Sequence, residues 1–386
     1  MASYRIVRHI GRGGMADAFL AVQTAARGVE KLVVVKRMFP NLAARPEIVR
    51  MFLDEAGFAS SIRHPNVVQS LDLGRDNGLY IAMEYLSGET LNYVFHELRR
   101  RGDEPMPYPV ACRIAADVAA GLHGAHTASD ADGLPRCIIH RDVSPSNLLV
   151  CYTGNTKVLD FGVAKLRFGP DERPRDVFCG KLSYAAPEQV DGSPVDPRTD
   201  IFQLGIVLHE LLTGRHLFTA ETEQATLMSA LHRPIPPPSQ MNSIVPPELD
   251  AIVLSSLERD LRLRTASADA VSEQLLGVLR RYGHYVGHGK VASWMRRTFA
   301  ERRAERAEQE HLARRDRRRR TPHATPPLFP ELPADTGHVT LPTLPSLARP
   351  RRRAARGHQR ARVVAGTAAA LLGALGLGRD SRGDED

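Results

Sequence analysis

The sequence predicts an α+β fold in two lobes, a small β-rich lobe followed by a larger helical lobe. Up to about residue 86, short runs of β-branched and aromatic residues alternate with glycine-containing turns, interrupted by one helical segment. From residue 107 to about residue 285, the apolar residues recur at helical spacing instead. The 386 residues leave room for both lobes and for a tail.

The first lobe shows the clearest strand pattern. We expect antiparallel strands over residues 4–10, 18–23, 32–37 and 79–85. Residues 46–62 form a helix in this prediction, because Ile48, Phe52, Glu55 and Ala59 recur at helical spacing. In the second lobe, residues 110–125 and 201–212 are apolar enough to form core helices.

The chain changes character after Trp294. Residues 300–320 are an Arg- and Glu-rich helical run, and residues 321–350 are Pro-rich without periodicity, which is typical of a disordered linker. Residues 351–362 are polybasic, and residues 363–378 are uncharged. A helix of that last length spans about 24 Å, short of the roughly 30 Å of a hydrocarbon core, so a membrane anchor and a disordered end both stay open.

The formal net charge of +8 comes largely from arginines after residue 300 and therefore describes the tail. Residues 300–320 lack interleaved aromatic residues and carry several acidic ones, which favours a solvated helix face over a nucleic-acid reader. At a membrane, the polybasic segment can bind anionic lipid. The four cysteines form no C-x-x-C pair and the N-terminus lacks a signal peptide's apolar stretch, so we expect both lobes in a reducing cytoplasm.

The most specific pattern is the run I-I-H-R-D-V-S-P-S-N-L-L-V at residues 138–150, followed by V-L-D-F-G at residues 158–162. It places Asp142 where a carboxylate can accept a proton from a hydroxyl group. Asn147 and Asp160 supply oxygen ligands of the kind that magnesium prefers. With the run G-R-G-G-M at residues 11–15, these motifs resemble the bacterial branch of the eukaryotic-type (Hanks-type) serine/threonine protein kinases.

The resemblance implies a two-lobed protein kinase fold, with an N-lobe at residues 4–86, a C-lobe at 87–282 and a basic helical extension at 283–320. It implies transfer of the ATP γ-phosphate to serine or threonine hydroxyls of protein substrates, including autophosphorylation, with ATP and Mg²⁺ as cofactors. No specific nucleic acid is expected. The alternatives are an ATP-binding pseudokinase scaffold and a nucleic-acid binder that uses the basic tail.

Two motifs of the N-lobe fit the phosphate-binding part of such a site. Gly11, Gly13 and Gly14 lie between two strands, where backbone N–H groups can close over phosphates, although a glycine-rich hairpin is by itself often only a turn. Lys36 ends the run V-V-V-K, and a buried lysine there needs the phosphates or Glu55 as anionic partners. Taken alone, Lys36 also fits an edge strand that reaches solvent.

The run M-E-Y-L-S-G-E at residues 83–89 resembles the hinge of this family. By that resemblance, Met83 is the gatekeeper, and the backbones of Glu84 and Leu86 bond the adenine. Glu89 then reaches the ribose, and Leu149 closes the adenine slot from below.

The adenine slot contains a paired departure from the family pattern. The family usually has Val at position 18 and Ala at position 34, whereas this chain has Ala18 and Val34. Because the small and the large side chain have exchanged places, the total volume is roughly kept. We expect a slot that is repacked rather than lost.

Two further departures bear on catalysis. Ser144 stands where serine/threonine kinases have a lysine that touches the transferred phosphate, and Ala16 stands where the third loop glycine is expected. In G-K-L-S-Y-A-A-P-E at residues 180–188, Lys181 replaces the threonine that normally lies beside Asp142. Either Lys181 supplies the missing positive charge, or its side chain points into solvent.

The segment before these residues bears on control. Val177 occupies the position where the family often has a phosphorylated threonine, and Asp176 lies beside it. A carboxylate there can partly replace a phosphate, which predicts weak dependence on activation-segment phosphorylation. Elsewhere in the C-lobe, Arg264 is expected to pair with Glu188. Asp200 is expected to hold the backbone of the catalytic loop, which is the run at residues 138–150 that contains Asp142 and Asn147.

Overall fold

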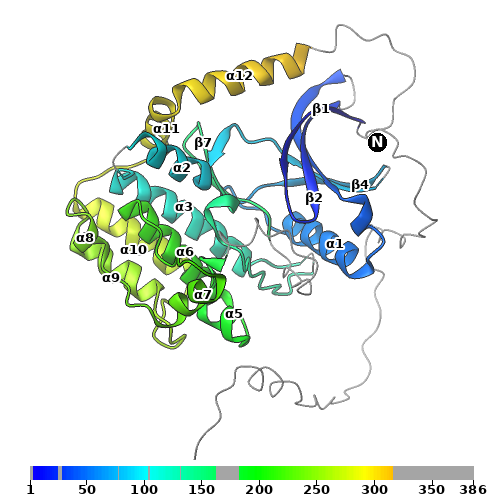
Figure 1. Cartoon of the computed structure of the whole chain (residues 1–386). Helices are drawn as coiled ribbons and strands as arrows, with labels where there is room; N and C mark the ends of the chain where they lie inside the picture. Colours follow the sequence, from blue (N-terminus) through cyan, green and yellow to red (C-terminus); the bar gives the residue numbers. More distant parts are fainter. Residues whose placement is uncertain are drawn as a thin grey trace, which may run out of the picture. The chain divides into compact units, whose positions relative to one another are not determined.

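The computed structural model describes residues 3–24, 28–76, 78–102, 105–130, 132–161 and 182–315, and the statements on structure below refer to these residues. The chain divides into two compact units, residues 1–339 and residues 340–386, and all the described residues lie in the first. In this unit an antiparallel sheet precedes a mainly helical lobe, as predicted (Figure 1).

The N-lobe is a twisted sheet with one long helix. Its strand order is β1-β2-β3-β5-β4, with antiparallel pairing throughout. Its elements are β1 (Ser3–Arg12), β2 (Ala16–Thr24), β3 (Glu30–Met38), the short 3-10 helix η2 (Pro40–Leu42), α1 (Pro46–Ser61), β4 (Ser70–Arg75) and β5 (Leu79–Glu84).

The register of this sheet decides which side chains share a face. Ala18 on β2 lies opposite Lys36 on β3, and Val34 on β3 lies opposite Met83 on β5. Since side chains alternate between the two faces of a strand, these four residues lie on one face of the sheet. The other face is buried mainly through Ala21, Val33, Val35, Tyr80 and Ala82.

A smaller sheet and a series of helices follow. The small sheet has the order β6-β7-β8 and joins the segment after β5 to the strands that follow the catalytic loop. The elements are β6 (Gly88–Thr90), α2 (Leu91–Arg101), α3 (Tyr108–His126), the 3-10 helix η3 (Pro145–Asn147), β7 (Leu148–Cys151), β8 (Thr156–Val158), α5 (Pro187–Asp191), α6 (Pro197–Thr213), α7 (Glu223–His232), α8 (Pro238–Met241), α9 (Pro247–Ser256), α10 (Ala268–Arg281), α11 (His288–Thr298) and α12 (Ala300–Arg315).

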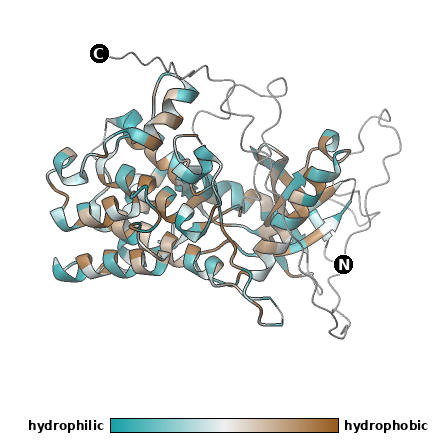
Figure 2. Ribbon diagram, turned by 90° about the horizontal axis from the view of Figure 1, so that it is seen from below, coloured by the Kyte–Doolittle hydropathy of each residue, from teal (hydrophilic) through white to brown (hydrophobic). Residues whose placement is uncertain are grey.

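Helix α6 lies at the centre of the C-lobe. Every residue from 199 to 213 is buried, and α3, α9 and α10 pack around this helix. A helix that is apolar on nearly all sides is stable only when other elements surround it. Figure 2 shows hydrophobic and hydrophilic stretches alternating along the helices of this lobe, as packing against a common core requires.

The core of the C-lobe continues beyond residue 282, where the sequence placed its end. Val291, Trp294 and Met295 of α11 are buried in the same apolar cluster as α3 and α6. The turn between β7 and β8 comes so close to α11 that a Cβ on Gly154 would lie 1.9 Å from the His288 carbonyl oxygen. Helix α11 is therefore part of the lobe rather than an appendage.

Helix α12 corrects the prediction of a solvated helix at residues 300–320. Ala313 is only 1% exposed and packs with Leu20, Val22 and Leu32 of the N-lobe sheet. The carbonyl oxygen of Ala313 also accepts a hydrogen bond of 2.9 Å from Arg5 Nη2. The prediction took the charge of the segment as a sign of exposure to solvent. In the structure, long side chains of α12 contact the N-lobe through their polar ends instead.

Glu89 forms the innermost contact of α12. Its carboxylate is 2% exposed and accepts hydrogen bonds from Arg306 Nε and, at 2.7 Å, from Arg306 Nη2. Tyr152 OH donates to the same carboxylate at 3.0 Å, and Arg302 Nε lies 3.5 Å away. A buried carboxylate needs such partners, so α12 and the small sheet stabilise each other.

The tail beyond α12 lies outside the described residues. This includes the Pro-rich, polybasic and uncharged segments at residues 321–350, 351–362 and 363–378. Within the described ranges, no helix combines the length and the apolar character needed to cross a bilayer.

We expect Arg306→Ala to lower the free energy of unfolding of the full chain by about 2 kcal/mol. The Glu89 carboxylate stays buried in this variant, and among the described residues only Tyr152 and Arg302 remain to offset its charge. Arg303→Ala, on the exposed side of the same helix, is the matched control and should change it by less than about 0.5 kcal/mol. Urea unfolding followed by circular dichroism measures both.

Adding Glu89→Gln to Arg306→Ala should recover part of the loss, since a neutral amide needs no countercharge. Equal stability of the Arg306→Ala and Arg303→Ala chains would contradict the assigned role of α12.

Candidate active site

An ion-pair chain joins β3, α1 and the loop after β8. Lys36 Nζ lies 2.5 Å from Glu55 Oε1 and 3.1 Å from Asp160 Oδ1. The Lys36 side chain is 14% exposed and that of Glu55 only 6%. Burial by itself lowers the pKa of Lys36, but the charges of Asp160 and Glu55 outweigh burial and raise that pKa. Lys36 is therefore a fixed cation beside the Asp160 carboxylate.

The catalytic loop is ordered by Asn147. Its side-chain Nδ2 donates to the carbonyl oxygen and to Oδ2 of Asp142, each at 2.8 Å. These bonds orient the Asp142 carboxylate and also fix the Asn147 amide, so Oδ1 of Asn147 is the atom left to ligate a metal. An amide oxygen and the Asp160 carboxylate fit the oxygen ligands that magnesium requires.

Asp200 holds the backbone of the same loop from below. It is 0% exposed, and its two oxygens accept hydrogen bonds of 2.8 Å from the N–H groups of His140 and Arg141. His126 Nε2 donates to Oδ2 of Asp200 at 2.7 Å. The predicted contact of Asp200 with the catalytic loop is thus present.

Two residues next to the reacting groups have left-handed backbone conformations. Arg141 has φ = 64° and Asp160 has φ = 41°, in a region that costs a non-glycine residue on the order of 1–3 kcal/mol. The surrounding contacts hold these conformations in place: His140 Nε2 donates to Leu159 O at 2.8 Å, and its ring packs 4.8 Å from that of Phe161. Such strain is typical of functional loops.

The glycine-rich turn closes one end of the β1–β2 hairpin. The Gly13 N–H donates to Ala16 O at 2.8 Å, and Arg12 Nε donates across the hairpin to Asp17 Oδ1 at 3.0 Å. A Cβ on Gly11 or on Gly14 would meet no atom of the described chain within 4 Å. The packing of the described residues therefore does not require glycine at these two positions.

The residues assigned to adenine form a band across the two lobes. All of them are partly exposed; they are Ala18, Val34, Met83, Leu86 and Leu149. The N–H of Glu84 already donates to Gln69 O at 3.0 Å. A bond from the Glu84 backbone to adenine would therefore have to use its carbonyl oxygen.

The structure does not bring Glu89 to this band. Its carboxylate is enclosed by Arg306 and Tyr152, so it is not placed to reach a ribose as the resemblance implied. The prediction that Glu89 reaches the ribose came from its position in the hinge run. The sequence did not reveal that Arg306 of α12 binds the Glu89 side chain on β6.

Ser144 lies within the described residues, whereas Lys181 does not. Ser144 is 2% exposed, and its hydroxyl has no hydrogen-bond partner among the described residues. Lys181, the expected source of the missing positive charge, lies outside the described residues, as do Asp176 and Val177.

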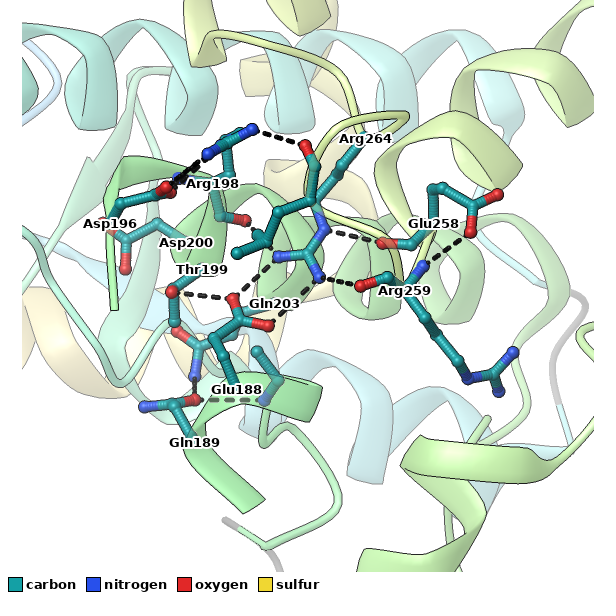
Figure 3. A network of polar contacts seen from close by, with 12 residues as sticks. Glu188, Gln189, Asp196, Arg198, Thr199, Asp200, Gln203, Glu258, Arg259 and Arg264 are labelled. Atoms are coloured by element: carbon teal, nitrogen blue, oxygen red, sulfur yellow. Dashed lines mark hydrogen bonds and ion pairs between the residues drawn. The ribbon is translucent and has the colours of Figure 1, made fainter. Parts of the chain in front are cut away.

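A buried polar network ties α5 to α6 beneath the catalytic loop (Figure 3). Arg264 donates to both carboxylate oxygens of Glu188, at 2.7 and 3.1 Å, which is the ion pair that the sequence predicted. Thr199 Oγ1 donates to Glu188 at 2.7 Å, and the Arg264 guanidinium lies 4.9 Å from the centre of the Phe202 ring.

Two further residues near Asp142 were not predicted from the sequence. Gln203 and Gln189 contact the backbone next to this carboxylate. The signal available was a polar amide, Gln203, in the middle of an otherwise core-forming helix. Gln203 lies in the run D-I-F-Q-L-G at residues 200–205, which resembles a family helix start, but that resemblance does not indicate a contact with the backbone beside Asp142.

Comparison with known proteins shows the family and the fold. The model of the protein kinase domain family matches residues 4–276. The chain is 40% identical over 301 residues to the tyrosine-protein kinase MasK of Myxococcus xanthus, covering 78% of this chain and 46% of that protein. It is 33% identical over 258 residues to the serine/threonine-protein kinase PrkC of Bacillus subtilis, covering 67% of this chain and 37% of that protein.

The chain thus spans less than half the length of either relative. Among solved structures, the PknI kinase domain of Mycobacterium tuberculosis superposes with a TM-score of 0.53 at 24% sequence identity, over 71% of this chain and 95% of that one. This likeness confirms the two-lobed kinase fold that the sequence predicted.

The Arg264 ion pair makes a direct stability prediction. Arg264→Met removes one partner of a pair whose side chains are 0% and 4% exposed, and should lower the free energy of unfolding by about 3–5 kcal/mol. Arg262→Ala, two residues away, is the control, because its side chain is 88% exposed and should contribute less than about 1 kcal/mol. Chemical denaturation compares the two, and similar losses would rule out the buried pair.

Proposed function

This chain belongs to the protein kinase domain family, and from that premise we propose that it is a serine/threonine kinase that phosphorylates proteins with ATP. The observation that carries the proposal is the combined geometry of two groups. Asn147 orients the Asp142 carboxylate, and Lys36 bridges Glu55 and Asp160. Phosphoryl transfer depends mainly on such positioning and on charge stabilisation.

Each of these residues has one role in the proposed reaction. Lys36, held by Glu55, binds the ATP phosphates, and the N–H groups around Gly13 close over them. Asp142 accepts the proton of the substrate hydroxyl as its oxygen attacks the γ-phosphorus. Asn147 Oδ1 and the Asp160 carboxylate would hold Mg²⁺, which supplies neutralisation of the phosphate charge.

The adenine band supports a repacked slot. Ala18 lies opposite Lys36, and Val34 lies two positions from Lys36 on the same strand. The exchanged side chains Ala18 and Val34 therefore share one face of the sheet, together with Met83 opposite Val34. We propose that the adenine packs against this face, with Leu149 of β7 on its other side.

The most specific part of the proposal is the type of residue that accepts the phosphate. Serine or threonine is supported by the activation-segment pattern and by relatives named as serine/threonine kinases. Tyrosine is favoured by one observation, the 40% identity to a protein named as a tyrosine kinase, and Ser144 leaves the usual lysine missing. A pseudokinase scaffold is disfavoured because Lys36, Asp142, Asn147 and Asp160 are retained in one constellation.

Other parts of the proposal rest on the sequence. They are a cytoplasmic location of the kinase lobes, attachment of residues 351–378 to an anionic membrane, and weak dependence on activation-segment phosphorylation. The partners proposed are protein substrates.

The full chain, incubated with labelled ATP, Mg²⁺ and a generic basic protein, should transfer phosphate to serine and threonine. Asp142→Asn should reduce the turnover rate by about 100-fold or more, because the general base is lost. Asp269→Asn, at an exposed carboxylate on α10, is the control and should leave the rate unchanged. Acid hydrolysis of the product identifies the phosphorylated residue.

Phosphotyrosine alone would overturn the serine/threonine assignment. No transfer by the wild type, with ATP binding retained, would favour the scaffold.

We further propose that Lys181 replaces the lysine missing at Ser144. Lys181→Ala should then lower the turnover rate by about tenfold or more through loss of transition-state charge stabilisation. Adding Ser144→Lys to Lys181→Ala should recover part of the rate, since it restores the charge on the usual side. Steady-state kinetics tests this, and an unchanged rate in Lys181→Ala would rule it out.

A further inference from the structure

We propose that Gln203 and Gln189 form an amide bridge that positions Asp142 by holding the backbone on both sides of it. The two glutamines are positioning residues and touch neither ATP nor the acceptor hydroxyl. The inference rests on the function proposed above, and it adds a specific source of order in the catalytic loop.

Gln203 reaches both neighbours of Asp142 with one side chain. Its Oε1 accepts a hydrogen bond of 2.9 Å from the N–H of Val143, and its Nε2 donates to Arg141 O at 3.2 Å. The same Nε2 donates to Gln189 Oε1 at 2.9 Å. Gln203 is 2% exposed, so these bonds form away from water and satisfy the whole amide.

Gln189 completes the bridge from the other side. Its Nε2 donates to Arg141 O at 2.9 Å, and its Oε1 accepts from the N–H of Ala186 at 3.0 Å as well as from Gln203. Figure 3 shows Gln189 of α5 and Gln203 of α6 facing each other. The bridge therefore links the catalytic loop to the segment that begins α5.

The bridge acts on a strained peptide. Arg141, with φ = 64°, directly precedes Asp142. Its N–H is held by Asp200, and its carbonyl oxygen accepts from both glutamines. A left-handed residue keeps such a conformation only when its surroundings determine it, so the amide bridge fixes the direction in which Asp142 leaves the turn.

Only a group that both donates and accepts can occupy the centre of this arrangement. An apolar side chain at position 203 would leave the Val143 N–H buried without its acceptor. A carboxylate would face two oxygen acceptors, Arg141 O and Gln189 Oε1, with no hydrogen to donate until it binds a proton. This difference separates a positioning role from general packing.

The decisive variant is Gln203→Glu in the full chain. Burial and the two facing oxygens raise the pKa of the introduced carboxyl. When protonated, this carboxyl can donate and accept almost as the amide does. The ratio of its kcat to that of the wild type should therefore rise as pH falls, by about tenfold from pH 8 to pH 6.

The affinity for ATP provides a second readout. Lys36, Glu55 and Asp160 do not contact the bridge, so Gln203→Leu and Gln189→Met should lower kcat by about tenfold and leave the Kd of ATP unchanged. Combining the two substitutions should cost less than the product of the single effects, because they break one network. Gln240→Leu, at an exposed amide, is the matched control and should change neither quantity.

Hydrogen exchange tests the bridge even without catalysis. The N–H of Val143 should exchange at least about tenfold faster in Gln203→Leu than in the wild type, because its acceptor is gone. A wild type that transfers no phosphate would defeat the proposed function, yet this exchange would still decide the bridge. If Gln203→Leu fails to fold, Gln189→Met and the pH profile of Gln203→Glu decide.

Unchanged kcat and unchanged Val143 exchange in the glutamine variants would overturn the bridge. So would a Gln203→Glu to wild-type kcat ratio that stays flat with pH, because a purely structural loss has no reason to be reversed by protonation.

Discussion

The buried carboxylate of Asp200 is the contact on which the catalytic loop depends. It binds two consecutive backbone N–H groups, of His140 and Arg141, and it receives a third bond from His126. Because α6 is buried on nearly all sides, Asp200 cannot move relative to the C-lobe core. The turn that carries Asp142 is thus fixed to the buried helix α6.

The N-lobe contributes its part through charge. Lys36 stands between Glu55 of α1 and Asp160 of the loop after β8, so a single ammonium group joins the sheet, the helix and this loop. A buried ammonium group is stable only with such partners. With Lys36 in contact with both Glu55 and Asp160, the site has the arrangement that would bind the ATP phosphates and magnesium.

The fold and the catalytic constellation could be predicted because both have short-range signals. Local periodicity indicates the strands and helices. The spacing of Asp142, Asn147 and Asp160 is a short motif, because the side-chain oxygens of these residues must be held close together. The packing of α12 was not predictable in this way. Its contact with Glu89 joins residues more than 200 positions apart through Arg306, and the Arg-rich pattern suits a solvated helix equally well. Gln203 was missed for the same reason, since the tertiary fold brings its partners Arg141, Val143 and Gln189 to it from other parts of the chain.

The kinetics of Asp200→Asn test the central claim most directly. The amide keeps the shape of the carboxylate but offers one acceptor oxygen in place of two, so at least one buried N–H of the loop loses its partner. The account predicts that kcat for phosphate transfer falls by at least about tenfold while the Kd of ATP stays within about twofold. Wild-type turnover in Asp200→Asn would show that the loop is held by something else and would contradict the account.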